Sequence, residues 1–324
     1  MTPSELSRGS SRKSRRPKIT VIVPTYSRPS ILREAIMSVL NQTYKDYEIV
    51  VVNDAGPDVE AVLAPLRGSQ NEIIYLRHDS HRGLAAARNT GLRAARGKYI
   101  SYLDDDDIFF PDHLERLVTF LEGGKYKVAY SDAYHAFQKN VNGKYVVTSR
   151  DVLYSFDFDQ DRILIGNFVP IICLMHEKSC MDAIGLFDES LRAHEDWDLL
   201  IRLSMHYEIA HVRGITCEYR WRDDKTTMTS SMRSDFVNTA DVIYERYRSY
   251  SNMPRLIHKF REGTMSKLLK DLTLFHLYSR RFGYRIAMLR MIQRLARRFR
   301  GLEKGPSGDL LFDTRNTNGE KLFS

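Results

Sequence analysis

Four consecutive aspartates, Asp104–Asp107, are the residues of this sequence whose type and spacing are best suited to chemistry. They follow an apolar run, Lys98–Leu103, which is typical of a buried strand. Four carboxylates held close together repel one another strongly unless a cation lies between them. Their hard oxygens suit Mg²⁺ or Mn²⁺, and Mg²⁺ takes its remaining ligands from water and substrate phosphates. The pattern therefore predicts a divalent-cation site, with a solvated acidic turn as the alternative.

Polar residues also follow the three earlier apolar runs. Tyr26, next to Thr25, offers a flat face for a nucleobase, or else it covers the core as a rim aromatic. Asp54 can accept hydrogen bonds from a ribose or a base, although aspartate at a strand end is often only a turn former. Arg82 can clamp a diphosphate. Arg88 is the weaker candidate, because it also fits a helix surface.

A second acidic pair, Glu195-Asp196, opens the helical pattern Glu195–His206. Carboxylates at a helix start are stabilised by the helix dipole, and this alone explains many of them. A functional interpretation is a general base that takes a proton from a hydroxyl, with the neighbouring acid tuning its pKa.

Strand and helix patterns alternate from residue 18 to residue 121, and this alternation must position these side chains. Alternating elements predict a parallel sheet covered by helices on both faces, with ligands bound beyond the carboxyl ends of the strands. No GxGxxG follows the first strand, so dinucleotide binding of the Rossmann type has no support. The predicted strands are 18–24, 47–53, 72–77 and 98–103, and the predicted helices are 31–40, 59–66, 83–95 and 111–121, with Ser27 as a candidate N-cap of the first.

Composition places the chain among soluble globular proteins, since 43% of its 324 residues are hydrophobic and 28% are charged. The net charge of +8 comes from the ends: residues 1–18 carry +5 and residues 279–304 carry +8, which leaves −5 for the rest. An acidic middle argues against a nucleic-acid groove. Three cysteines without a CxxC pair favour free thiols in a reducing compartment.

The two ends differ in character from the middle. Residues 1–17 predict a disordered basic arm that lacks the apolar core of a signal peptide. The apolar stretch 165–175 is too short to span a bilayer. Residues 279–300 form one apolar stripe with arginines mostly opposite, which fits a helix lying on a membrane surface or one packed on its own domain. We expect a cytoplasmic protein, with peripheral contact at the inner face of the cell membrane through this helix.

Taken together, four segments resemble glycosyltransferase family 2, the nucleotide-sugar transferases with the GT-A fold. They follow the family's order and spacing from about residue 19 to 222. The segments are VIVPTYSRPSILREAIMSVLNQTY, EIVVVNDAG, LRHDSHRGLAAARNTGLRAARGKYISYLDDDD and GLFDESLRAHEDWDLLIRL.

The resemblance implies a role for each matching residue. Thr25, Tyr26 and Asp54 would hold the nucleobase and ribose, and Arg82 the diphosphate. Asp104 and Asp106 would form the DxD pair, with Asp106 as the direct metal ligand and Asp105 near the sugar. Glu195 and Asp196 would be the catalytic acidic pair, with Asp196 as the base of an inverting reaction. The acceptor would be bound by Trp197, Arg220 and Trp221.

One departure from the family's polysaccharide synthases concerns the sequence Cys217-Glu-Tyr-Arg-Trp221. Those processive enzymes carry QxxRW and membrane helices, whereas this chain keeps Arg-Trp without the Gln and has no membrane-span pattern. A single-addition transferase is therefore expected. It would use a UDP-sugar and a divalent cation (Mn²⁺ or Mg²⁺) to glycosylate a saccharide or lipid-linked acceptor in cell-surface polysaccharide or glycoconjugate synthesis.

The expected organisation is a basic arm at 1–17, a GT-A domain at 18–232 with a Rossmann-like, mostly parallel sheet, and a helical extension at 233–324. Two other functions stay open at this point: a non-catalytic sugar-nucleotide binder and an Asp-dependent phosphatase. The phosphatase is disfavoured because its DxD usually follows the first strand, while Asp104–Asp107 follow the fourth.

Overall fold

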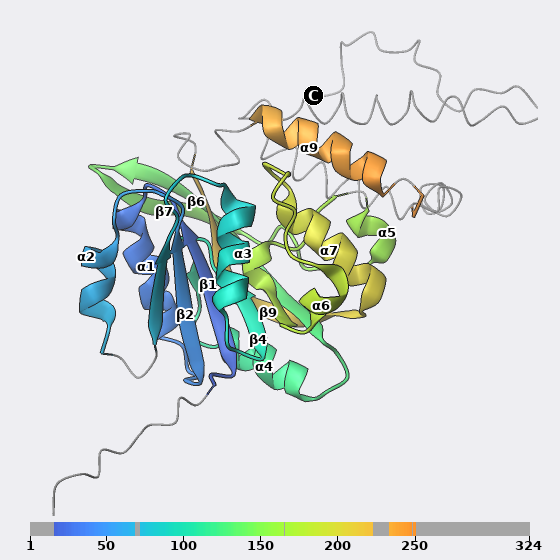
Figure 1. Cartoon of the computed structure of the whole chain (residues 1–324), viewed down its shortest axis with the longest axis horizontal. Coiled ribbons are helices and arrows are strands. Elements are labelled where there is room, and N and C mark those ends of the chain that lie inside the picture. Colours follow the sequence, from blue (N-terminus) through green and yellow to red (C-terminus); the bar gives the residue numbers. More distant parts are fainter. Residues whose placement is uncertain (1–15, 69–71, 165, 223–232, 248, 251–324) are drawn as a thin grey trace, which may run out of the picture. The chain divides into compact units, whose positions relative to one another are not determined.

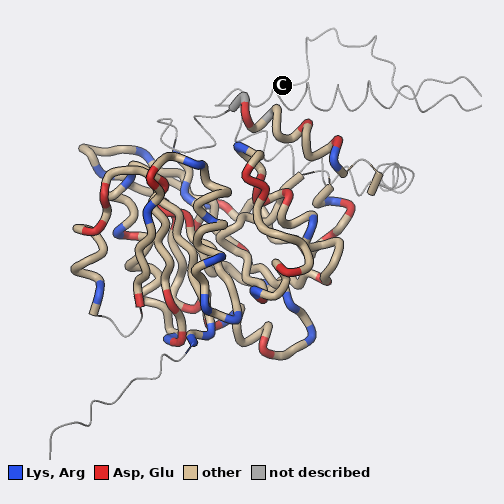
Figure 2. The backbone as a smooth tube through the Cα atoms, in the orientation of Figure 1, with Lys and Arg blue, Asp and Glu red and all other residues tan. Residues whose placement is uncertain are grey.

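The computed structural model describes residues 16–68, 72–164, 166–222, 233–247 and 249–250 (Figure 1). The chain divides into two compact units, 1–264 and 265–324, and the described residues all lie in the first. The predicted basic helix 279–300 and most of the predicted arm 1–17 lie outside the described residues. Acidic and basic residues are interspersed along the described part (Figure 2).

Nine strands of the described part form one sheet in the order β3-β2-β1-β4-β8-β6-β9-β5, with β7 paired to β6. The pairs β1–β2, β2–β3, β1–β4 and β6–β9 are parallel, and the others are antiparallel. The strands are β1 (Ile19–Thr25), β2 (Tyr47–Asn53), β3 (Ile73–Arg77), β4 (Tyr99–Tyr102), β5 (Ile108–Phe109), β6 (Val128–Val141), β7 (Lys144–Asp151), β8 (Leu174–Glu177) and β9 (Ile209–Arg222).

Helices connect and cover these strands (Figure 1). The chain moves from β1 to β2 in one direction along the sheet and from β3 to β4 in the other, so right-handed crossovers place α1 and α3 on opposite faces. The helices are α1 (Pro29–Leu40), α2 (Glu60–Leu63), α3 (Leu84–Ala94), α4 (His113–Glu122), α5 (Gln160–Ile163), α6 (Cys180–Ile184), α7 (Glu195–His206) and α9 (Arg233–Arg246), with short 3₁₀ turns η1 (Ala64–Leu66) and η2 (Ile171–Cys173).

The predicted α/β class and the mostly parallel first half are confirmed, since the four predicted strands 18–24, 47–53, 72–77 and 98–103 correspond to β1–β4. One local prediction is wrong. Arg28, not Ser27, precedes the first turn of α1, and no side chain caps that helix. Pro29 at the first position has no N–H to satisfy, and the backbone N–H groups of Ile31 and Leu32 donate to the Arg28 carbonyl.

The first part of the predicted helical extension packs on the same unit. In α9, Ala240 and Ile243 are buried, and Arg246 at its end donates to Asp198 of α7 at 2.7 Å. The adjacent Tyr247 hydroxyl donates to the same carboxylate at 2.7 Å. No helix in the described ranges is long and apolar enough to cross a membrane.

Candidate functional site

A crevice is expected between the carboxyl ends of β1 and β4, because the chain leaves these neighbouring strands in opposite directions. The loops that follow the two strands meet there. The Thr25 hydroxyl donates a hydrogen bond of 2.6 Å to Asp105. The side chains that the sequence placed after the first and fourth strands are thus in direct contact.

Two arginines pair with the middle of the Asp104–Asp107 loop. Arg28 lies 2.5 Å from Asp105 and 2.7 Å from Asp106. Arg222, at the end of β9, reaches the same Asp106 oxygen at 3.0 Å and is itself buried. The repulsion expected among these carboxylates is therefore offset by guanidinium groups in this structure, and the same groups are suited to holding a diphosphate.

Arg88 links the aspartate loop to the second acidic pair. Its guanidinium lies 2.7 Å from Asp104 and 2.5 Å from Glu195, and the side chain is only 2% exposed. Asp104 follows β4 and Glu195 opens α7, so the two motifs, 91 residues apart in the sequence, meet on one buried cation. This contradicts the interpretation of Arg88 as a surface helix residue.

A close approach of α3 to the sheet brings Arg88 to this place. Gly91 lies one turn further along the helix, and a Cβ atom there would stand 2.4 Å from Cγ2 of Ile22 in β1. Only a residue without a side chain allows this spacing. Helix and strand therefore pack closely, and the arginine reaches the loop above β4.

Burial changes the acid–base properties of the aspartate loop. It raises the pKa of Asp105 to about 7, with Asp106 adding to the effect and Arg28 opposing it. Burial also raises the pKa of Asp107 well above its usual range. One Asp107 oxygen accepts the backbone N–H of Arg220 at 2.7 Å, and the other has no hydrogen-bond partner among the described residues.

The predicted base, Asp196, lies in the first turn of α7. Its carboxylate accepts hydrogen bonds from Asn167 at 3.1 Å and from the backbone N–H of Trp197 at 2.7 Å. Burial raises its pKa to about 7, the Glu195 charge raises it further, and Arg88 opposes both. A carboxyl group with a pKa near neutrality is well matched to taking a proton from a hydroxyl.

The aspartate loop has the right donor atoms for a divalent cation. Asp104 and Asp106 each contribute carboxylate oxygens, although each has one oxygen paired with arginine. No group of three or more metal-ligating side chains occurs in the part of the chain that the structure describes. Two carboxylates nevertheless suffice for Mg²⁺, which takes its other ligands from water and substrate phosphates.

Asp54 organises the loop between β3 and α3. Its first oxygen accepts the His78 ring at 2.7 Å and the Arg82 backbone N–H at 2.9 Å. Its second oxygen accepts the Gly83 backbone N–H at 2.7 Å. Nδ1 of His78 must carry a proton to donate to this carboxylate, and Nε2 lies 2.8 Å from the Thr90 hydroxyl.

Two predicted ligand contacts gain no support from this geometry. The side chain of Arg82 pairs with Glu189 at the surface, at 3.2 Å, while only its backbone contacts Asp54. Trp197 is 3% exposed, and its indole N–H donates to the Ile163 carbonyl at 2.5 Å. Its predicted place beside the acceptor stays a prediction.

The predicted acceptor residues Arg220 and Trp221 lie on opposite faces of β9, as the alternation of a strand requires. Arg220 is buried and pairs with Glu218 at 2.9 Å and Glu34 at 2.8 Å. The Trp221 ring instead packs edge-on against Phe137 of β6, with 5.7 Å between ring centroids. Their roles at the acceptor stay predictions.

Sequence reasoning missed Arg28 and Arg222, although the sequence carries a signal for both. Arg28 stands two residues after Tyr26 in the same loop. Glu218, Arg220 and Arg222 alternate with aromatic residues, and this period of two predicts one charged face of a strand. The local pattern does not show which segment this face contacts, so it could not predict the contact with the aspartate loop.

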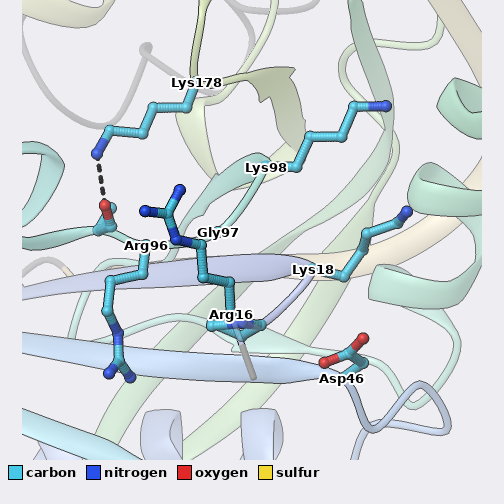
Figure 3. A pocket seen from close by; sticks show the side chains of 9 residues that line it. Arg16, Lys18, Asp46, Arg96, Gly97, Lys98 and Lys178 are labelled. Carbon is cyan, nitrogen blue, oxygen red and sulfur yellow. Dashed lines mark hydrogen bonds between the residues drawn. The ribbon is translucent and has the colours of Figure 1, made fainter. Parts of the chain in front are cut away.

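A separate cavity of about 680 Å³ lies at the opposite edge of the sheet, where β1 and β4 begin (Figure 3). Most of its cations have partners among the described residues. Arg96 pairs with Glu48, Lys98 with Glu122, and the Lys178 ammonium donates to the Ala95 carbonyl. The cavity shares none of the residues described above.

Known proteins provide an independent comparison. The sequence model described as "Glycosyl transferase family 2" matches residues 20–182. An uncharacterized glycosyltransferase, YwdF of Bacillus subtilis, is 30% identical over 231 residues, covering 71% of this chain and 84% of the relative. A Rickettsia conorii relative, uncharacterized glycosyltransferase RC0461, is 34% identical over 203 residues, but the match covers only 31% of its length.

Solved structures share the fold. The TarS 1-349 structure from S. aureus aligns with a TM-score of 0.52 and 19% identity, covering 70% of this chain and 64% of that chain. The same protein in complex with UDP aligns at 0.52 with 20% identity, over 70% and 64% of the two chains. Its complex with UDP-GlcNAc aligns at 0.51 with 21% identity, over 63% and 59%.

Proposed function

The chain belongs to glycosyl transferase family 2, and we propose that it transfers a sugar from a UDP-sugar to an acceptor hydroxyl with inversion at the anomeric carbon. The observation that carries this proposal is the position of Arg88 between Asp104 and Glu195. Through Arg88, the aspartate loop, which with its arginines is suited to a diphosphate and a cation, lies next to the acidic pair that contains the proposed base, Asp196. A sugar held between them would have its leaving group on one side and the attacking hydroxyl on the other.

The donor would lie in the crevice between β1 and β4. Its base would stack on Tyr26, and its diphosphate would lie at the aspartate loop between Arg28 and Arg222. The choice of uridine rests on the complexes of the structurally similar TarS with UDP and UDP-GlcNAc. Arg28 and Arg222 are better placed for the diphosphate than Arg82, whose side chain pairs with Glu189.

In the transfer step, the acceptor oxygen would attack the anomeric carbon in line with the bond to the diphosphate. The new C–O bond would form as the bond to the phosphate oxygen breaks, and the bonding electrons would leave with the nucleoside diphosphate. Asp196 would take the proton of the acceptor hydroxyl. Arg28 and Arg222 would stabilise the charge that develops on the leaving group, in positions fixed before the reaction.

Asp104 and Asp106 would hold the divalent cation, Mn²⁺ or Mg²⁺, with Asp106 as the direct ligand. When bound, the cation supplies Lewis-acid stabilisation of the leaving diphosphate. Before it binds, the arginines neutralise the two carboxylates. Donor and cation binding would therefore exchange arginine–carboxylate pairs for arginine–phosphate and carboxylate–metal contacts.

The acceptor would be a saccharide or a lipid-linked saccharide used in cell-surface polysaccharide or glycoconjugate synthesis. The sequence supports a membrane-proximal acceptor through the basic amphipathic pattern at 279–300. A cytoplasmic protein held at the inner face of the membrane would meet such an acceptor there.

Thermal unfolding with Mn²⁺ and a panel of nucleoside diphosphates tests the donor site without knowledge of the acceptor. We expect UDP to raise Tm by several degrees, because a ligand at about 100 times its Kd adds roughly 2.7 kcal/mol to the free energy of unfolding. The shift should need the cation and should be lost in Asp106→Asn. Asp182→Asn, an exposed aspartate in α6, is the matched control.

The possible outcomes test the choice of nucleotide, the cation site and the donor site separately. A shift with another nucleotide and none with UDP would contradict the uridine donor alone. A shift that is independent of metal and retained in Asp106→Asn would contradict the cation site. The absence of a shift with any nucleotide would contradict the donor site and favour a non-catalytic role.

A further inference from the structure

His81 lies against two residues of the proposed base site. Its ring rests on the Tyr26 ring, with 4.4 Å between centroids and an interplanar angle of 32°. Its Nδ1 lies 2.8 Å from the second oxygen of Asp54. Both Tyr26 and His81 are exposed, so this contact forms at the surface of the crevice.

Three hydrogen-bond donors already use the carboxylate of Asp54, and the His81 ring stands against it. A carboxylate offers about four lone-pair positions. The His78 ring and the Arg82 and Gly83 backbone N–H groups fill three of them. His81 stands at the fourth. A base can reach Asp54 only if one of these four groups leaves.

His81 is the group that can leave most readily. His78 is buried and tied on its far side to Thr90. The Arg82 and Gly83 amides belong to the backbone that leads into α3, so moving either would disturb the loop. The His81 side chain is 58% exposed, and a contact made by such a side chain contributes little to stability.

We propose that His81 is a built-in competitor of the donor, whose imidazole occupies the place of the nucleobase until the base displaces it. This inference rests on the proposed function. The imidazole is a flat heteroaromatic ring that packs against Tyr26 at a tilt and presents a nitrogen to Asp54. A nucleobase in its place would use the same two contacts, with a ring N–H where Nδ1 now stands.

The single vacated position also selects the kind of base. Uracil presents one imide N–H, which matches the one acceptor position that His81 leaves. Guanine presents two adjacent donors, and the second would meet the Asp54 oxygen already filled by His78 and Arg82. Cytosine presents a ring acceptor beside its amino group, which the carboxylate repels. His81 displacement therefore favours a uracil-type base.

Calorimetric titration of the full-length protein with UDP and Mn²⁺ tests this competition. In His81→Ala we expect the Kd for UDP to fall by about twofold to tenfold, because the base no longer displaces a side-chain contact. Removing a group that only lines a binding site would have the opposite effect. His206→Ala, at an exposed histidine that ends α7, should leave the Kd unchanged.

His81→Phe provides a second variant, since it keeps an aromatic ring for Tyr26 but cannot contact Asp54; its Kd should lie between those of wild type and His81→Ala. Unchanged or weaker UDP binding by His81→Ala, in a protein whose wild type binds UDP, overturns the competitor role and leaves the proposed function intact. Tighter binding of GDP than UDP by His81→Ala overturns the base selection. If neither wild type nor variant binds any nucleotide, the proposed function fails together with this inference.

Discussion

At the residue scale, the site is organised by buried arginines rather than by the carboxylates themselves. Arg88 is the clearest case, because one side chain neutralises two acids from different elements. A buried cation of this kind is costly to bring out of water and is stable only when both partners are present. Its removal should therefore affect folding as well as chemistry.

Arg88→Met should lower the free energy of unfolding by roughly 3–5 kcal/mol, since it leaves Glu195 and Asp104 without their shared partner. Urea denaturation measures this difference. Arg82→Met is the matched control: its ion pair with Glu189 is exposed and should be worth about 1 kcal/mol or less. Equal losses in the two variants would contradict the bridging role.

Asp196→Asn should reduce the transfer rate by about 10²–10⁴-fold, the usual contribution of a general base. In the wild type, the rate should rise with pH around the Asp196 pKa of about 7, because only the ionised form takes a proton. Initial rates with a donor and acceptor between pH 5.5 and 8.5 measure this. A variant as active as wild type would exclude Asp196 as the base.

As pH rises, ionisation of the same carboxyl group should lower the free energy of unfolding, although it raises the transfer rate. Its pKa is higher in the folded than in the unfolded chain, so it stabilises the fold at low pH and loses this contribution as pH rises through about 7. Asp196→Asn carries no such charge. Its stability relative to wild type should therefore increase between pH 4 and pH 8, as measured by urea denaturation at each pH, and a constant difference would argue against a raised pKa.

At the element scale, the packing of α3 on β1 determines that Arg88 lies between Asp104 and Glu195. Gly91→Ala should lower the free energy of unfolding by roughly 1–2 kcal/mol, because the clash with buried Ile22 outweighs the better helix propensity of alanine. Gly166→Ala is the control, since a Cβ there meets nothing within 4 Å. Chemical denaturation should show a loss only in the first variant, and a neutral Gly91→Ala would mean that the helix can shift outward freely.

At the scale of the whole molecule, the positive charge at the C-terminal end predicts contact with anionic lipid. Deleting residues 279–324 should reduce binding to vesicles that contain anionic phospholipid, and added salt should weaken the binding of the full chain. A shorter deletion, 301–324, keeps the basic amphipathic pattern and should bind as the full chain does. Unchanged binding after the longer deletion, measured by vesicle sedimentation, would exclude this segment as the membrane contact.

The sequence by itself determined the class of fold and the positions of the reactive residues along the chain. The periods of the apolar runs are local properties, and they predicted β1–β4 and the intervening helices. The rule that ligands bind at the carboxyl ends of parallel strands then assigned Thr25 and Asp105 to the same edge of the sheet, and the structure adds the hydrogen bond between them. The acidic motifs with their family resemblance predicted a glycosyltransferase.

Only the tertiary structure decided which residues are partners. Arg82 looked better placed than Arg88 along the chain, yet the helix buries Arg88 between two acids and leaves Arg82 at the surface. Asp54 looked free to receive a ligand, but three hydrogen-bond donors and the His81 ring, all from one loop, surround it. These outcomes depend on contacts between residues far apart in sequence and on burial, and neither is encoded in local spacing.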